Sequence, residues 1–200
     1  ISSSGKTVPE DTGAYPKSAL VTTDTEIESQ NMIDYLCSCG HKRIAFITSR
    51  DEGLGRCHLN GYKRALEKNG LEYDEKLIIR LKPAKRIYTI ENGYNCTCEL
   101  LKSGVDFSCI YAISDTLAVG ACRAIIDSGK RVPEDYCVAG ADGQDIAEYY
   151  HPSITTLKYP RVETAQQSVR TLFDMIDRKK VVKRQILGGT LIERESTRKL

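Results

Sequence analysis

The stretch Tyr111–Asp142, YAISDTLAVGACRAIIDSGKRVPEDYCVAGAD, decides the fold class of this chain. A short apolar run, Ser108 to Ile113, predicts a buried strand, and an apolar helix follows it and ends at Gly129. Tyr136 to Ala141 is a second buried run. Strand, helix and strand in this order predict a βαβ unit with two parallel strands and a right-handed crossover.

Polar residues follow both of these strands. Ser114 and Asp115 come directly after the first strand, and Asp142 comes directly after the second. In an open parallel sheet, ligands bind in the crevice outside the carboxyl ends of the strands. We therefore expect these three residues to line one crevice, with Asp115 also in the position of a helix N-cap.

The same alternation extends over most of the chain. Further strands are expected at 18–23, 43–48 and 76–81, and helices at 25–39, 56–69 and 91–103. After Asp142 we expect a short helix, an extended segment at 154–158, a helix from Pro160 to about Asp177 and a strand-like run at Gln185–Arg194. Residues 1–17 have the composition of a loop. The fold class is therefore predicted as α/β, a parallel sheet flanked by helices on both faces.

Composition narrows the range of functions. The 200 residues are 40% hydrophobic and 28% charged with a net charge of +2, which is ordinary for a soluble globular protein and leaves no strong footprint for nucleic acid or membrane. No apolar stretch approaches the roughly 18 residues of a membrane span. The chain opens without Met and without a signal peptide, so we expect a fragment of a longer protein.

Eight cysteines raise the question of disulfides or a metal site. Cys37 and Cys39 are two residues apart, as are Cys96 and Cys98, and this spacing fits neither a zinc site nor a contact on one helix face. We expect reduced thiols, no metal, no cofactor and a cytoplasmic setting. Phosphate loops and the common motifs of hydrolases and metalloproteases are missing from the sequence, so an enzyme is not expected.

The Tyr111–Asp142 stretch resembles the effector-binding domain of LacI/GalR-type transcription regulators, which carry a close variant of ASDxxAxGAxRAxxxxGxRVPEDxxVxGxDD. The likeness covers about residues 18–196 in the right order and includes these further segments: Val21–Asp24, Gly40–Ile47, Arg56–Leu66, Pro152–Leu157 and Leu191–Ser196. The resemblance implies a fold like that of type I periplasmic binding proteins. Those proteins have two α/β lobes joined by three crossovers, with the effector between the lobes.

The resemblance also implies a division of the chain. Residues 25–159 and 189–196 would form the complete C-terminal lobe, and residues 1–24 and 160–188 would be remnants of the N-terminal lobe and the crossovers. The helix-turn-helix headpiece of the family is expected to be absent from this chain.

Site residues follow from the resemblance position by position. Asp142 matches the pocket carboxylate of the family, which can accept two hydroxyl hydrogen bonds from a sugar; a turn-forming Asp before Gly143 is the structural alternative. Ser114 matches a position where sugar-binding relatives often have Asn. His58 stands where the family usually has an arginine, and Arg56 matches another common basic position.

Three further residues complete the predicted site. Tyr88 matches a position that commonly holds an aromatic residue for stacking on a sugar face, although a half-buried loop tyrosine would look the same. Tyr159 matches a position at the last crossover where relatives often have a polar side chain that reaches the ligand. Asp115 is included because it adjoins Ser114, with a structural role favoured.

The resemblance implies the ligand-sensing and dimerisation domain of a bacterial LacI-type regulator or repressor. It would bind a small molecule, expected to be a sugar or derivative, and DNA only through the headpiece; no membrane contact is expected. An extracytoplasmic sugar-binding protein of an uptake system is the alternative. The helix Thr116–Ser128 carries more apolar residues than one buried face requires. This fits a homodimer contact, and flanking by the sheet and a neighbouring helix explains it equally well.

Overall fold

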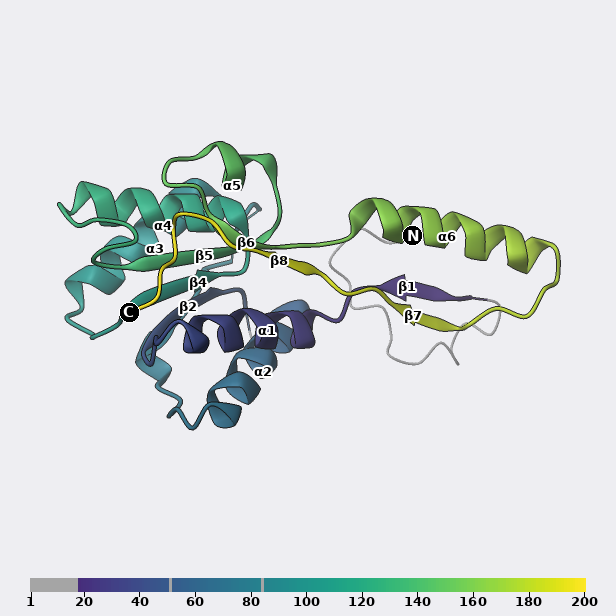
Figure 1. The fold of residues 1–200 in the computed structure, drawn as a ribbon, viewed down its shortest axis with the longest axis horizontal. Helices are drawn as coiled ribbons and strands as arrows, with labels where there is room; N and C mark the ends of the chain where they lie inside the picture. The colour runs from purple at the N-terminus through teal and green to yellow at the C-terminus, as the bar shows by residue number, and fades with distance from the viewer. Residues whose placement is uncertain (1–17, 51, 84) are drawn as a thin grey trace.

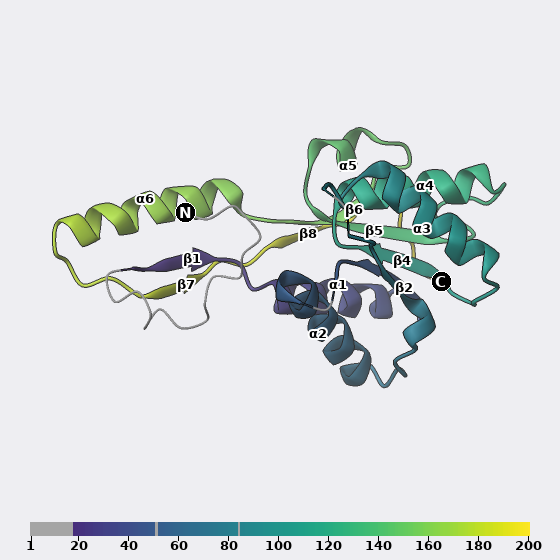
Figure 2. The ribbon, with the colours of Figure 1, turned by 180° about the vertical axis from the view of Figure 1, so that it is seen from behind.

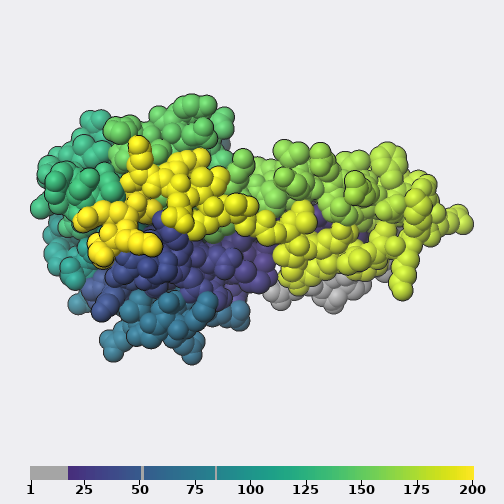
Figure 3. All heavy atoms as spheres, in the orientation of Figure 1, coloured from purple at the N-terminus to yellow at the C-terminus, as the bar shows by residue number. Residues whose placement is uncertain are grey.

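The computed structural model describes residues 18–50, 52–83 and 85–200, which form a wide body and a narrow arm (Figure 1). The body contains a six-stranded sheet with helices on both of its faces, and the arm contains a two-stranded sheet and one long helix. Figure 2 shows the same division from behind, and Figure 3 shows the arm projecting from one side of the body.

The sheet of the body has six strands in the spatial order β3-β2-β4-β5-β6-β8. The strands are β2 (Ile44–Thr48), β3 (Ile78–Arg80), β4 (Cys109–Ala112), β5 (Cys137–Asp142), β6 (Thr155–Lys158) and β8 (Thr190–Ile192). All neighbours pair in parallel except β8, which runs antiparallel to β6. The α/β fold class predicted from the sequence is confirmed.

Two pairs of helices cover the two faces of this sheet. The helices of the body are α1 (Thr25–Ser38), α2 (Gly53–Lys68), α3 (Ile90–Lys102), α4 (Asp115–Asp127) and α5 (Asp145–Tyr149), with a 3₁₀ turn η2 at Glu75–Leu77. α1 packs on α2 on one face and α3 packs on α4 on the other (Figure 1). The predicted excess of apolar residues on α4 is therefore explained within the chain, because the sheet and α3 both cover that helix.

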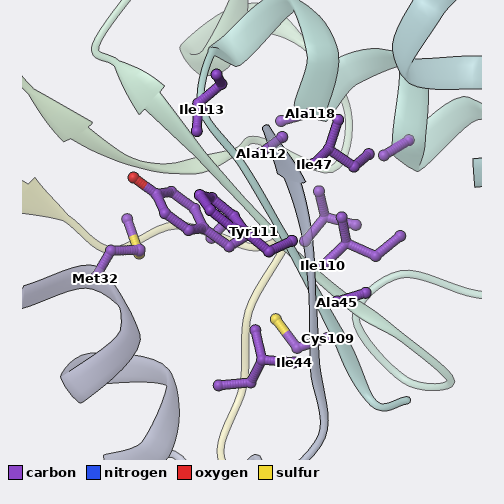
Figure 4. Close-up of a cluster of buried hydrophobic side chains, with 14 of the residues drawn as sticks. Met32, Ile44, Ala45, Ile47, Cys109, Ile110, Tyr111, Ala112, Ile113 and Ala118 are labelled. Atoms are coloured by element: carbon purple, nitrogen blue, oxygen red, sulfur yellow. The ribbon is translucent and has the colours of Figure 1, made fainter. Parts of the chain in front are cut away.

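The core lies between the sheet and these helices. Phe46 of β2 stacks on Tyr62 of α2 and on Tyr111 of β4, with ring centroids 5.0 and 5.2 Å apart. Figure 4 shows the buried side chains of β2 and β4 with Met32 of α1 and Ala118 of α4. This packing joins β2 and β4 to the helices on both sides of the sheet.

The arm contains β1 (Leu20–Thr22) and β7 (Arg184–Ile186), paired in parallel, and α6 (Arg161–Ile176) packed beside them. The chain passes between body and arm three times, from β1 to α1, from β6 to α6 and from β7 to β8 (Figure 1). One side of α6 exposes these apolar side chains: Val162, Val169, Leu172, Phe173 and Ile176.

Three sequence predictions are wrong in detail. Ser114, rather than Asp115, is the N-cap of α4, because its Oγ accepts the Leu117 N–H at 3.3 Å. Gln185–Arg194 is not one strand, since Gly188 and Gly189 separate β7 in the arm from β8 in the body. α2 begins three residues earlier than predicted, at Gly53. The loop predicted at residues 1–17 lies outside the described residues.

Candidate functional site at the carboxyl ends of the strands

The parallel strands of the body end at the edge that faces the arm (Figure 1). Asp142 is the last residue of β5 and lies next to Lys158, the last residue of β6. It has a φ of 109°, in a region that residues other than glycine rarely adopt. Backbone strain of this kind often occurs where a side chain must be presented for binding.

The carboxylate of Asp142 is half-buried and has two polar partners. Gln144 Nε2 donates to Oδ2 at 2.8 Å, and a guanidinium nitrogen of Arg161 lies 3.6 Å from Oδ1. Burial raises the pKa of Asp142, while Gln144 and Arg161 lower it. Because Arg161 is the first residue of α6, this ion pair joins the body to the arm.

Asp115 has the structural role that was favoured for it. It is fully buried, its Oδ2 accepts the Gln144 backbone N–H and its Oδ1 accepts the Thr156 hydroxyl, both at 2.6 Å. Burial raises its pKa to about 6, although both hydrogen bonds lower it. Asp115 thereby ties the start of α4 to β6 and to the loop that follows Asp142.

Ser114 and Tyr88 are linked through one hydroxyl. Thr116 Oγ1 lies 3.1 Å from Ser114 Oγ and donates to the Tyr88 carbonyl oxygen at 3.3 Å. Ser114 is buried as the cap of α4, whereas the Tyr88 side chain is 47% exposed in the loop before α3. Tyr88 therefore has a free ring surface at this edge, and Ser114 has little.

Tyr159 follows β6 on the second crossover and is partly buried against the core. Burial raises the pKa of its hydroxyl well above the usual value, and the nearby Tyr111, Glu28, Asp142 and Asp115 raise it further. Tyr159 therefore supplies an aromatic ring and a neutral hydroxyl directly after the end of β6.

His58 and Arg56 lie on α2, at the other side of the predicted site. His58 is buried, and its Nδ1 lies 2.6 Å from the Ser29 hydroxyl of α1. Burial lowers its pKa to about 4, so the ring is neutral near pH 7. Arg56 is exposed, three residues into α2. The hydrogen-bond partner of His58 belongs to α1, so its ring is held by the neighbouring helix and not by the strand ends that carry Ser114 and Asp142.

Sequence reasoning missed Gln144 and Arg161, the two partners of the Asp142 carboxylate. Gln144 could have been suspected from its position two residues after a strand-end carboxylate. Arg161 follows a Pro and carries no motif, so only the geometry of the second crossover reveals it.

Two surface depressions of the described residues lie away from this edge, one beside Phe107 and Leu200 and one beside Met175 and Lys180, and none of the seven predicted site residues lines them. In the described residues, His, Cys, Asp and Glu side chains form no group of three or more suited to a metal ion, and none of the cysteines there forms a disulfide.

Comparisons with known proteins agree with this architecture. The periplasmic binding protein-like domain family matches residues 33–197. The solved structure of a sugar-binding LacI-family transcriptional regulator from Escherichia coli, complexed with phosphate, has a TM-score of 0.84 and 30% identity, covering 98% of this chain and 67% of that one. The chain belongs to the periplasmic binding protein-like family of LacI-type regulators.

Two further LacI-type relatives support the assignment. The chain is 40% identical over 146 residues to the HTH-type transcriptional regulator MalR of Clostridium butyricum, which covers 73% of this chain and 42% of MalR. The structure of the transcriptional regulator CelR in complex with cellobiose has a TM-score of 0.79 and 31% identity, covering 90% of this chain and 54% of that one.

These LacI-type relatives are transcriptional regulators, which agrees with the family predicted from the sequence. The chain spans about half the length of the curated relatives it matches, 42% of MalR and 51% of AscG from Escherichia coli. Every helix in the described ranges is too short or too polar to cross a bilayer.

Proposed function

We propose that the chain is the effector-sensing part of a LacI-type regulator and binds a sugar or sugar derivative between body and arm, at Asp142. The observation that carries this proposal is the strained, half-buried Asp142 carboxylate paired with Arg161 of the arm. A second support is the structure of CelR, a regulator with the same fold, which was solved as a complex with cellobiose.

The chemistry of the edge suits a polyhydroxylated ligand. A carboxylate accepts hydrogen bonds from two neighbouring hydroxyls, and Gln144 and Arg161 add donors for ring or hydroxyl oxygens. The exposed Tyr88 ring offers an apolar face on which a sugar stacks. Ser114, Asp115 and Tyr159 shape the wall of this site, and Arg56 and His58 bound it on the side of α2.

The ion pair between Asp142 and Arg161 gives a physical route from binding to movement. The Arg161 side chain is 58% exposed, so the pair is weak, and ligand hydroxyls can replace it. A ligand that contacts both residues favours one position of the arm relative to the body. To shift the ratio of two arm positions from 1:99 to 99:1, such a ligand must bind the favoured position more tightly by about 5.5 kcal/mol.

The proposal is tested by thermal melting of the protein against a panel of sugars, sugar phosphates and nucleosides. A true ligand at 100 times its Kd stabilises the protein by about 2.7 kcal/mol. Asp142→Asn keeps the side-chain shape and removes the charge, so we expect the stabilisation to be lost. Asp106→Asn is the matched control, because Asp106 is 88% exposed on the loop leading into the amino end of β4 and should leave the ligand response unchanged.

Two outcomes contradict the assignment. Asp142→Asn that retains the full ligand-induced stabilisation removes Asp142 from the site. If Asp142→Asn and Asp106→Asn lose the ligand-induced stabilisation equally, the loss comes from the change in overall charge and not from a local contact with the ligand.

We also assign the arm to a second lobe. Residues 1–24 and 160–188 would belong to that lobe and its crossovers, and residues 25–159 and 189–196 to the C-terminal lobe. The exposed apolar side of α6 supports this assignment. Exposing such a stripe of apolar side chains to water costs free energy, so another surface is expected to cover it. The greater length of the relatives provides for further strands of this lobe.

The remaining parts of the proposal rest on kinship. A LacI-type regulator acts in the cytoplasm as a homodimer and reaches DNA through a separate headpiece. Sedimentation of the protein at micromolar concentrations should show a dimer, and a monomer at high micromolar concentration contradicts this part alone.

A further inference from the structure

Glu28 is a buried carboxyl that the ligand site does not use. It lies in the first turn of α1, and only 3% of its surface is exposed to solvent. Its Oε1 accepts the Gly189 backbone N–H at 3.0 Å, and its Oε2 has no hydrogen-bond partner of normal geometry among the described residues. A buried carboxylate oxygen without a partner costs free energy, so its presence calls for an explanation.

The position of Glu28 is where the three crossovers between body and arm meet. Its own helix starts at the end of the first crossover, and its backbone N–H donates to the Asp24 carbonyl oxygen. Gly189 belongs to the third crossover, from β7 to β8. Glu28 is also close enough to Tyr159, on the second crossover, to raise the pKa of that hydroxyl.

There is also little free space around Gly189, on the crossover side of its contact with Glu28. A Cβ atom on Gly189 would lie 2.6 Å from Leu157 Cδ2 and 2.9 Å from Glu28 Oε1. A side chain at this position would require the ends of the Leu157 and Glu28 side chains to shift, whereas glycine requires no adjustment. The Gly189 amide therefore contacts the Glu28 carboxyl directly and joins the third crossover to α1.

The charge on Glu28 changes near neutral pH. Burial raises its pKa to about 7, and the Asp24 charge adds to the rise, while the Gly189 N–H and the Thr23 hydroxyl lower it. No cation among the described residues contributes to this shift. The other ionisable groups that face it are Tyr111 of β4 and Tyr159, whose pKa values are raised by burial, so both stay neutral between pH 5 and 8.

We propose that Glu28 is a proton-dependent latch at the hinge between body and arm. In the neutral form it holds the Gly189 crossover against α1 and keeps the junction dry. In the ionised form the unpartnered Oε2 draws water into the junction, and the crossover loosens. This inference is independent of the proposed ligand and stands whether or not the chain binds a sugar.

Hydrogen exchange at the Gly189 amide, followed by NMR from pH 5 to 8, tests the latch. After correction for the intrinsic exchange rate, protection at Gly189 should fall by up to about tenfold per pH unit until pH 7 and level off above it, because the closed form binds the Glu28 proton more tightly. Glu28→Gln keeps an oxygen that accepts the Gly189 N–H and cannot ionise, so its protection should not depend on pH.

Two references make the result specific. Glu26→Gln is the matched variant on the same turn, where the carboxylate pairs with Arg64 at the surface, and it should behave like the unaltered protein. The Ile110 amide in the central strand reports global opening and should not follow the change. Asp115 also titrates at about 6, so the comparison with Glu28→Gln is needed to assign the effect.

The latch is overturned by any of three results. These are pH-independent protection of Gly189 in the unaltered protein, the same pH dependence in Glu28→Gln, and an equal loss of protection at Ile110. The last result would mean that Glu28 affects global stability rather than the hinge.

Discussion

At the scale of single residues, Asp115 shows how a buried charge serves structure. Its two oxygens satisfy the Gln144 N–H and the Thr156 hydroxyl, which are otherwise withdrawn from water. Asp115→Ala leaves both donors unpaired, and we expect it to lower the free energy of unfolding by about 2 kcal/mol. Urea denaturation at pH 7 measures this directly.

The control for this change lies at the other end of the same helix. Asp127 pairs with Arg123 on the surface, so Asp127→Ala should cost no more than about 0.5 kcal/mol. Similar losses in the two variants would mean that the hydrogen bonds of Asp115 contribute no more to stability than a surface ion pair does.

Residue roles were only partly predictable from the sequence. The position of Asp142 at a strand end follows from the apolar run before it. The cap of α4 was assigned to Asp115 rather than Ser114 because both residue types cap helices well and stand side by side. Glu28, Gln144 and Arg161 could not be identified, because their partners lie on segments far away in the sequence.

At the scale of elements, close helix pairs hold the two faces of the sheet. Gly120 of α4 lies against α3, and a Cβ atom there would come within 2.1 Å of the Ile90 carbonyl oxygen. Gly120→Ala must push the two helices apart, so we expect a loss of about 2 kcal/mol in stability, measured by urea denaturation.

Gly188→Ala is the matched control, because a Cβ atom at Gly188 meets nothing within 4 Å. It should leave stability unchanged or raise it by a few tenths of a kcal/mol through the unfolded state. A neutral Gly120→Ala would show that α3 moves freely and is not fixed against α4.

The order of the elements was predictable because glycine ends several helices and apolar runs mark the buried strands. Gly129 and Gly104, both with positive φ, end α4 and α3 in this way. Gln185–Arg194 was wrongly predicted to be one strand, because its apolar pattern continues on both sides of two glycines. No local signal says that β7 belongs to the arm and β8 to the body.

At the scale of the whole molecule, the body and the arm are joined, within the residues that the structure describes, by three crossovers and the side chains beside them. The Asp142–Arg161 ion pair and the Glu28–Gly189 hydrogen bond both lie at this junction. On the two proposals made above, their positions would give the molecule two separate controls on the arm, one for a ligand and one for a proton. The resemblance to a two-lobed family predicted the crossovers, and the structure supplies the contacts.

The most direct measurement is a crystal structure of the protein with a stabilising sugar. The account predicts ligand hydroxyls within about 3.2 Å of the Asp142 carboxylate, with Arg161 turned from Asp142 toward the ligand. A ligand bound at the amino ends of the strands, beside Cys109 and Cys137, would contradict it.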